Sequence, residues 1–151
     1  MRSIIPLLIV VFVVSLSCNK DKFTTIPQVT IKSISPNIVT NGNIVSMKGR
    51  FTDDEGDVDS VLIVYKWYNG STVVKNDTFR YTLENLDLPA KTRQADISID
   101  FQYNTFNPTG YVTLPAPSVR DTTGTLGLVL IDKEKNRSVY AESKPIRLIR
   151  P

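Results

Sequence analysis

The sequence contains no histidine, and its only cysteine is Cys18, near the start of the chain. Without histidine, neither a Ser-His-Asp nor a Cys-His catalytic arrangement can be built, nor a zinc site made of histidine and cysteine. A single thiol cannot form an internal disulfide, so a folded domain must be held together by packing alone. Catalysis would have to use carboxylates only, as in glycosidases with paired acids. A small carboxylate-dependent hydrolase is therefore a remote alternative.

Signals for binding nucleotides or nucleic acids are also missing. The sequence contains no G-x-x-x-x-G-K-[ST] and no G-x-G-x-x-G segment, so no phosphate-binding loop is expected. Its 18 basic and 15 acidic side chains give a formal net charge of +3, and no run of Lys or Arg occurs. This balance lacks the electrostatic pattern of nucleic-acid binding. We expect no nucleic-acid partner.

The first part of the chain has the pattern of a secretory signal peptide. Arg2 is followed by the apolar run "IIPLLIVVFVVSL" at residues 4–16, then by Ser17 and Cys18. The run is shorter than the roughly 20 apolar residues of a membrane span. "SLSC" resembles the lipobox of bacterial lipoproteins, which implies cleavage of residues 1–17 and lipidation of Cys18. The alternative is a transmembrane anchor that keeps a buried thiol.

The segment "CNKDKF" after this boundary is similar to the export tag of surface lipoproteins of the Bacteroidota. Lys20 and Asp21 match the tag, whereas Lys22 stands where a second acid is expected. The resemblance implies an outer-membrane lipoprotein, with the cell surface favoured over the periplasmic face. We expect a polar tether at residues 18–27, followed by one domain at residues 28–151.

The segments after residue 28 predict strands separated by turns. "NIVSMKGRF" and "ADISIDFQYN" alternate between apolar and polar residues, and "VLIVYKWY" at 61–68 is apolar on both faces, as expected of a central strand. Asn69-Gly70 after it predicts a type I′ hairpin. About seven strands and no helical period predict an all-β fold, an antiparallel two-layer sandwich.

Trp67 lies in the third predicted strand, where it resembles the core tryptophan of immunoglobulin-type domains. The resemblance implies an Ig-like β-sandwich, here without the matching disulfide. Tyr65 and Trp67 share a strand face with the apolar Val61 and Ile63. We therefore expect both aromatic rings in the core rather than on a sugar-binding platform.

The stretch "FTDDEGDVDS" at residues 51–60 is the strongest candidate for a site. Its acids at alternate positions would repel on a regular strand, so Gly56 favours a turn that brings the carboxylates together. Ca²⁺ takes six to eight oxygen ligands in flexible geometry, and the spacing does not fit an EF-hand. The candidate Ca²⁺ ligands are Asp53, Glu55, Asp57 and Asp59. The alternative is a solvated turn whose charge is partly offset by Lys48, Arg50 and Lys66.

This stretch resembles the F-x-D-x-D-G-D motif of Ig-like and PKD-like domains in bacterial surface lipoproteins. The matching residues are Phe51, Asp53, Glu55 in an aspartate position, Gly56 and Asp57. The resemblance implies an acidic loop between two strands, which holds Ca²⁺ in some relatives and is only a polar turn in others. Separately, Asp59-Ser60-Val61 and Asp121-Thr122-Thr123 resemble the O-glycosylation acceptor of the Bacteroidota.

These observations favour a non-catalytic, lipid-anchored protein of the bacterial envelope that binds or scaffolds. Its lipid would attach it to the membrane, and its partner would be an envelope protein or a glycan. The main alternative is a calcium-stabilised adhesion or carbohydrate-binding module, in which Ca²⁺ orders the acidic loop. No other cofactor is expected.

Overall fold

The computed structural model describes residues 24–83, 89, 91–105 and 111–151. The predicted signal peptide, Cys18 and most of the tether at residues 18–27 lie outside these residues. Across the described ranges, no helix is long and apolar enough to span a membrane.

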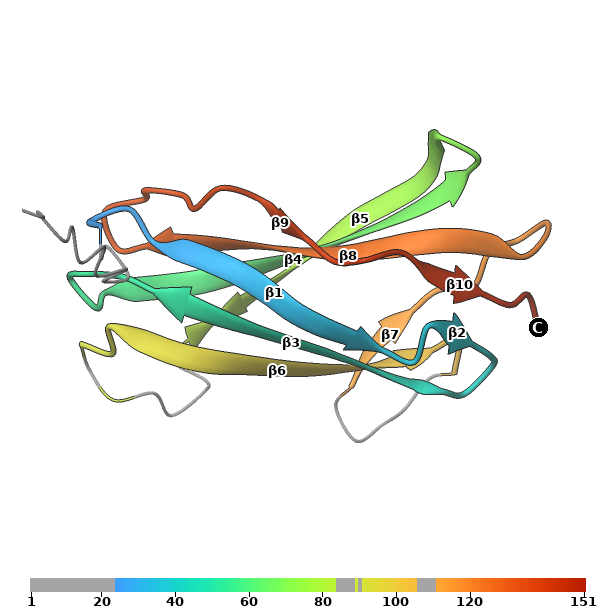
Figure 1. Cartoon of the computed structure of the whole chain (residues 1–151), viewed down its shortest axis with the longest axis horizontal. Helices are drawn as coiled ribbons and strands as arrows, with labels where there is room; N and C mark the ends of the chain where they lie inside the picture. Colours follow the sequence, from blue (N-terminus) through green and yellow to red (C-terminus); the bar gives the residue numbers. More distant parts are fainter. Residues whose placement is uncertain (1–23, 84–88, 90, 106–110) are drawn as a thin grey trace, which may run out of the picture.

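Two β-sheets face each other and form a β-sandwich (Figure 1). The first sheet has the order β1 (Gln28–Ser35), β3 (Ile44–Thr52), β6 (Gln94–Tyr103) and β7 (Val112–Leu114). The second sheet has the order β2 (Ile38–Val39), β10 (Ile146–Leu148), β8 (Thr122–Asp132), β4 (Val58–Asn69) and β5 (Thr72–Thr82), with β9 (Ala141–Glu142) pairing to β8. The predicted all-β sandwich is confirmed.

The described residues form more strands than the roughly seven that the sequence predicted. The described residues form six strands of eight to twelve residues and four strands of only two or three, namely β2, β7, β9 and β10. Two of the pairings are parallel, between β2 and β10 and between β6 and β7. Strands of two or three residues are too short to show an apolar alternation of their own, and β9 and β10 divide a segment that the sequence predicts as one closing strand.

Strand β4 is central, as predicted, because it pairs with β8 on one side and with β5 on the other. Its two faces nevertheless differ. The buried face carries Val61, Ile63, Tyr65 and Trp67, whereas the residues between them are only half-buried. The predicted hairpin after β4 is present, with Gly70 at a φ of 60°.

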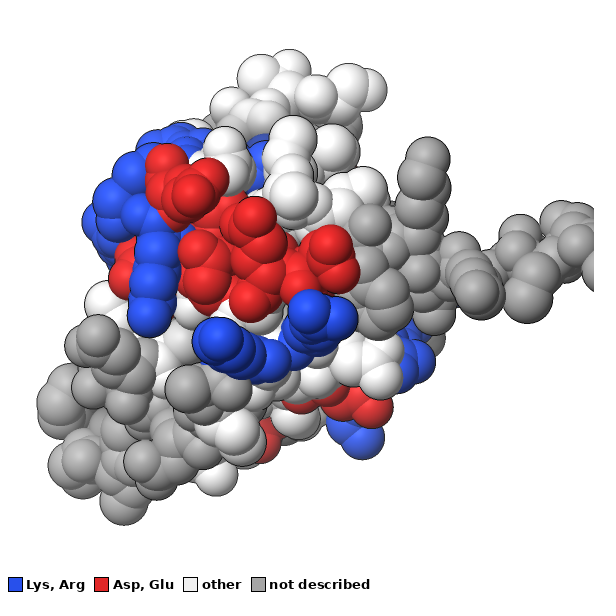
Figure 2. All heavy atoms as spheres, turned by 90° about the vertical axis from the view of Figure 1, so that its left-hand side faces the viewer, with Lys and Arg blue, Asp and Glu red and all other residues white. Residues whose placement is uncertain are grey.

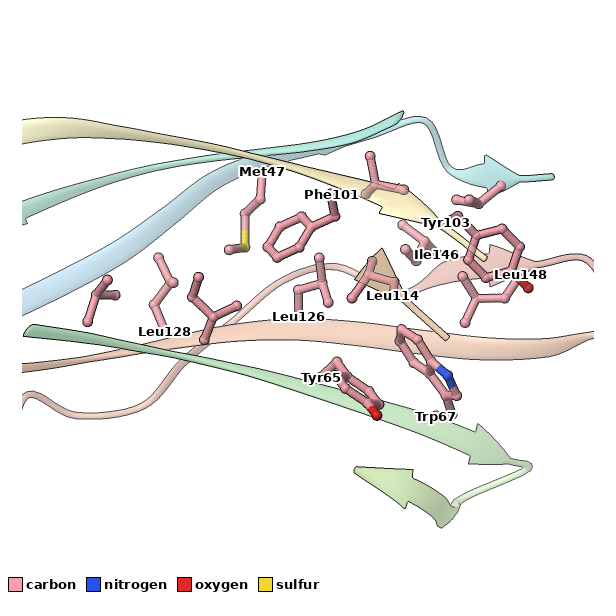
Figure 3. Packing of buried hydrophobic residues seen from close by; sticks show 14 of the residues in the cluster. Met47, Tyr65, Trp67, Phe101, Tyr103, Leu114, Leu126, Leu128, Ile146 and Leu148 are labelled. Atoms are coloured by element: carbon pink, nitrogen blue, oxygen red, sulfur yellow. The ribbon is translucent and has the colours of Figure 1, made fainter. Parts of the chain in front are cut away.

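The core fills the space between the two sheets, and aromatic rings occupy much of it (Figure 3). Trp67 is 1% exposed, and its indole Nε1 donates a hydrogen bond to the Pro115 carbonyl at 2.9 Å. The ring centroids of Tyr65 and Trp67 lie 4.7 Å apart. A Cβ at Gly124 would lie 2.5 Å from the Trp67 ring, so the glycine makes room for the indole. The predicted core placement of both rings is confirmed.

One end of the sandwich collects the loops that matter for the site. β3 ends there at Thr52, β4 begins there at Val58, and the adjacent β8 ends there at Asp132, at the left of Figure 1. Val58 and Asp132 are paired across β4 and β8. The pairing places the loop at residues 53–57 beside the turn at residues 133–136.

Candidate functional site

The acidic side chains gather at the end of the sandwich that these two loops form. Figure 2 shows them as one group, with Lys and Arg side chains around it. The loops are joined directly, because the backbone N–H of Lys133 donates to the carbonyl of Asp57 at 3.1 Å. We call residues 53–57 together with 132–136 the acidic end.

Asp53 is the most deeply buried acid of the acidic loop, with no exposed side-chain surface. Its Oδ2 accepts a hydrogen bond from the backbone N–H of Asp57 at 2.9 Å. Its Oδ1 is buried and has no hydrogen-bond partner. Burial raises the pKa of the Asp53 carboxyl, and the nearby Asp57 and Asp132 raise it further, although the hydrogen bond from Asp57 opposes the shift.

Gly56 shapes the turn that returns the chain to Asp53. Its φ is 64°, and a Cβ there would lie 2.6 Å from the carbonyl carbon of Lys91. A side chain at this position would therefore meet both backbone strain and a steric clash. The turn brings Asp57 back towards Asp53, and the Oδ1 of Asp57 is likewise buried without a partner.

Asp132 belongs to the same end, although the sequence analysis did not single it out. Its side chain is fully buried, and its two oxygens accept hydrogen bonds from the backbone N and the Nδ2 of Asn136, both at 2.8 Å. This is a side-chain-closed turn of the kind that Asp and Asn favour. The signal was an aspartate at the end of a buried strand, directly before the turn "KEKN".

The other two predicted Ca²⁺ ligands do not converge with Asp53 and Asp57. Glu55 is exposed at the tip of the loop. The Oδ2 of Asp59 lies 3.4 Å from Arg80 Nη2 and 3.7 Å from Lys135 Nζ. Among the residues that the structure describes, no group of three or more acidic side chains is arranged to hold a metal ion by itself.

Of Lys48, Arg50 and Lys66, which were expected to offset the charge of the loop, Arg50 and Lys66 pair elsewhere. Arg50 lies 4.0 Å from Asp96, and Lys66 lies 3.2 Å from Glu142. The cations near the loop include Arg93, at 3.9 Å from Asp54, and the two partners of Asp59. Lys91 and Lys133 line a cleft beside the loop.

A cleft of about 440 Å³ opens beside the loop. Glu55, Asp57 and Asp59 line it together with apolar side chains such as Phe51 and Leu83. The hydrolase alternative would use these carboxylates. Asp53 does not line this cleft, so its unpartnered oxygen is not part of that surface.

A second polar cluster lies on the outer face of the six-stranded sheet, around Glu142. Its Oε1 accepts hydrogen bonds from Thr125 at 2.8 Å and from Lys66, Tyr68 and Tyr140 at 3.2 Å each. The Nζ of Lys66 also lies 4.2 Å from the centre of the Tyr140 ring. Partial burial would raise the pKa of Glu142, but the hydrogen bonds from Thr125 and Lys66 outweigh it and lower the pKa.

The two sequences that resemble glycosylation acceptors are both engaged in the fold. Ser60 is fully buried in β4, and its hydroxyl accepts a hydrogen bond from Arg80 at 3.2 Å. Thr122 is half-buried, and its hydroxyl donates to the carbonyl of Tyr68. The hydroxyl of Ser60 is therefore closed to modification in the folded chain.

No protein-family model and no curated protein matches the sequence. Among solved structures, the sporulation control protein Spo0M of Bacillus subtilis aligns with a TM-score of 0.36 and 9% identity, over 83% of this chain and 49% of Spo0M. A glycosyl hydrolase family 2 member of Bacteroides cellulosilyticus gives 0.34 and 12%, over 83% and 15% of the two chains. The chain thus spans about half of the first protein and a small part of the second.

The third structure is the CARDB domain of a Pyrococcus furiosus protein in complex with di-metal ions. It aligns with a TM-score of 0.30 and 11% identity, over 85% of this chain and 92% of that domain. At these scores the three likenesses assign neither a function nor a ligand to this chain.

Proposed function

We propose that the protein is a non-catalytic, lipid-anchored module of the bacterial envelope that acts by binding or scaffolding. The observation that carries this proposal is the position of Cys18, the single cysteine, at the end of a signal-peptide pattern. A lipid on Cys18 would hold the β-sandwich at the outer membrane, and the polar residues after it would act as the tether. The surface side of that membrane fits the Lys20-Asp21 tag.

The ionisable side chains of the described residues support the non-catalytic part of the proposal. Glu142 has four hydrogen-bond donors, and Asp132 closes a turn. Asp121 accepts hydrogen bonds from the backbone of Arg150 and the side chain of Arg147, which together lower its pKa although partial burial opposes them. These carboxylates hold parts of the fold together, and the sequence supplies no histidine to assist catalysis.

Metabolic labelling tests the anchor. Full-length protein is expressed in a Bacteroidota host with an alkyne-tagged fatty acid, and the label and the membrane fraction are compared between wild type and Cys18→Ser. We expect the label and the membrane association to disappear in Cys18→Ser and to persist in the neighbouring control Asn19→Ala. Label that persists in Cys18→Ser would overturn the lipid anchor. Separately, protease treatment of intact cells that express the wild type decides between the surface and the periplasmic face.

An activity screen tests the non-catalytic part separately. Purified protein is incubated with glycan and peptide substrates, and product formation is measured for wild type, Asp57→Asn and Asp54→Asn. We expect no turnover with any of them. Turnover that is lost in Asp57→Asn but kept in Asp54→Asn would favour the hydrolase alternative in the cleft beside the acidic loop.

A further inference from the structure

We propose that one Ca²⁺ ion binds at the acidic end between the Oδ1 atoms of Asp53 and Asp57. The shell would be completed by main-chain carbonyl oxygens and water, with Asp132 contributing negative charge from the adjacent turn. This ligand set differs from the four alternating acids that the sequence predicted. The inference depends neither on the lipid anchor nor on the binding partner.

The Oδ1 atoms of Asp53 and Asp57 lack the partners that buried oxygens normally have. Both are buried, and neither has a hydrogen-bond partner. Nearly all buried polar atoms in proteins are hydrogen-bonded, so an unpartnered one calls for an explanation. Two buried carboxylate oxygens in one loop carry the further penalty of a buried negative charge. A bound cation would relieve both penalties.

Among the described residues, Asp53 has no cationic side chain paired with it. Asp53 has no exposed surface, and the charged side chains that face it at the acidic end are Asp57 and Asp132, both acids. Arg93, Arg80 and Lys135 pair with Asp54 and Asp59, and Lys91 and Lys133 line the cleft next to Asp57. Among the described residues, none of these cations pairs with Asp53, so its buried charge has no direct counter-ion.

The ligand atoms at this site indicate the kind of cation. The available ligand atoms are carboxylate and carbonyl oxygens, which select hard cations over zinc or copper. Ca²⁺ tolerates irregular geometry and six to eight ligands, whereas Mg²⁺ requires a regular octahedron and keeps several waters. A loop closed by a glycine turn and supplying only two carboxylates fits Ca²⁺ at the weak end of its range, with a Kd of about 0.1–1 mM.

The test uses purified protein stripped with EDTA and then dialysed free of chelator. Titration calorimetry with CaCl2 should show one ion per chain, and 5 mM Ca²⁺ should raise the unfolding midpoint by roughly 2–5 °C. MgCl2 at the same concentration should give less than half of this shift. Asp53→Asn and Asp57→Asn should each weaken Ca²⁺ binding by at least about tenfold, because each removes one charged ligand.

Two variants in the same segment serve as matched controls. Asp54→Asn removes the same charge from an exposed neighbour, and Asp59→Asn removes the acid that pairs with Arg80 and Lys135. Both should keep the Ca²⁺ affinity within about threefold, because these carboxylates are not ligands in the proposed site and already pair with Arg93, Arg80 and Lys135. If Asp53→Asn fails to fold, Asp57→Asn carries the test alone.

Several outcomes would overturn the proposal. If CaCl2 gave no heat of binding in the calorimeter and left the unfolding midpoint unchanged, a proton or a water molecule would occupy the space between the two oxygens. An equal loss of affinity in all four variants would mean diffuse attraction to an acidic surface. A loss in Asp59→Asn as large as that in Asp57→Asn would restore the ligand set that the sequence predicted.

Discussion

Glu142 and Asp53 are two carboxylates of the same sandwich in opposite situations. Glu142 lies at the surface, yet four side-chain donors reach one of its oxygens, and its pKa is lowered. Asp53 is fully buried, yet one of its oxygens has no donor, and its pKa is raised. The cluster around Glu142 is complete by itself, whereas Asp53 has no cationic side chain paired with it among the described residues.

The two carboxylates also differ in what they hold in place. Glu142 lies on β9, which pairs with β8, and its side chain ties this strand to Thr125 on β8 and Lys66 on β4. Asp53 closes the turn of the acidic loop through the backbone of Asp57. The charge of Glu142 is well paired, so it strengthens the contacts of that side chain. The charge of Asp53 is buried without a counter-ion, so keeping Asp53 ionised costs stability. This difference is what makes the acidic end, and not the cluster around Glu142, the place for a ligand.

The largest effect is expected from Asp132, the buried acid at the acidic end whose oxygens both have partners. Asp132→Ala should lower the free energy of unfolding by about 2–3 kcal/mol, because two hydrogen-bonded oxygens are lost and the Asn136 donors are left unpaired. Urea denaturation measures this change. Asn136→Ala should give part of the same loss, and the double variant should lose less than the sum. A loss below about 0.5 kcal/mol would show that burial of Asp132 contributes little.

Glu142→Gln tests how much the paired charge of Glu142 stabilises the folded protein. The amide oxygen can still accept hydrogen bonds, but the charge that strengthens them is gone. We expect the free energy of unfolding to fall by about 1 kcal/mol, a value at the low end for charged hydrogen bonds because Glu142 is partly exposed. Lys144→Gln, two residues away and outside the hydrogen bonds to Glu142, is the control for a surface charge change. An increase in stability would remove the contrast with Asp53.

Much of the fold could be predicted from the sequence, because the long strands carry their own pattern. The alternation in β3 and β6 and the Asn69-Gly70 turn are local features, and the structure confirms them. The short strands and the parallel pairings were not predictable, since they depend on which segments the folded chain brings together.

The candidate site divides in the same way. Gly56 correctly indicated a turn that brings Asp53 and Asp57 together. The arrival of Asp132 depends on the pairing of β4 with β8, which no local pattern reveals. The burial of Asp53 and the distant pairing of Arg50 also follow from the assembled sheets.

Asp53→Asn tests whether the buried charge of Asp53 destabilises the folded protein. In chelator at pH 7, we expect this variant to raise the free energy of unfolding by about 1 kcal/mol, because it removes an uncompensated buried charge. The new amide group can also donate to the Oδ1 of Asp57. Asp54→Asn in the same loop should change stability by less than about 0.5 kcal/mol. A loss of stability in Asp53→Asn would mean that the charge of Asp53 is favourable even without a metal ion.

The smallest effect, a pH dependence of opposite sign at the two carboxylates, sharpens the comparison further. The pKa of Asp53 in the folded protein is raised above 3.8, so its ionised form destabilises the protein at neutral pH. As the pH falls through the folded pKa towards 3.8, this penalty disappears, and the advantage of Asp53→Asn over wild type should shrink. The pKa of Glu142 is lowered below 4.5, so its stabilisation is complete above pH 4.5 and is lost as the pH falls through the folded pKa.

Urea denaturation of wild type, Asp53→Asn and Glu142→Gln in chelator, between pH 7 and pH 3, measures both differences. The Asp53→Asn difference should decline first, at pH values above 3.8, and the Glu142→Gln difference should decline only below pH 4.5. If the Asp53→Asn difference stayed constant down to pH 3, the charge of Asp53 would not be the source of the penalty. The acidic end would then be as well satisfied as the cluster around Glu142.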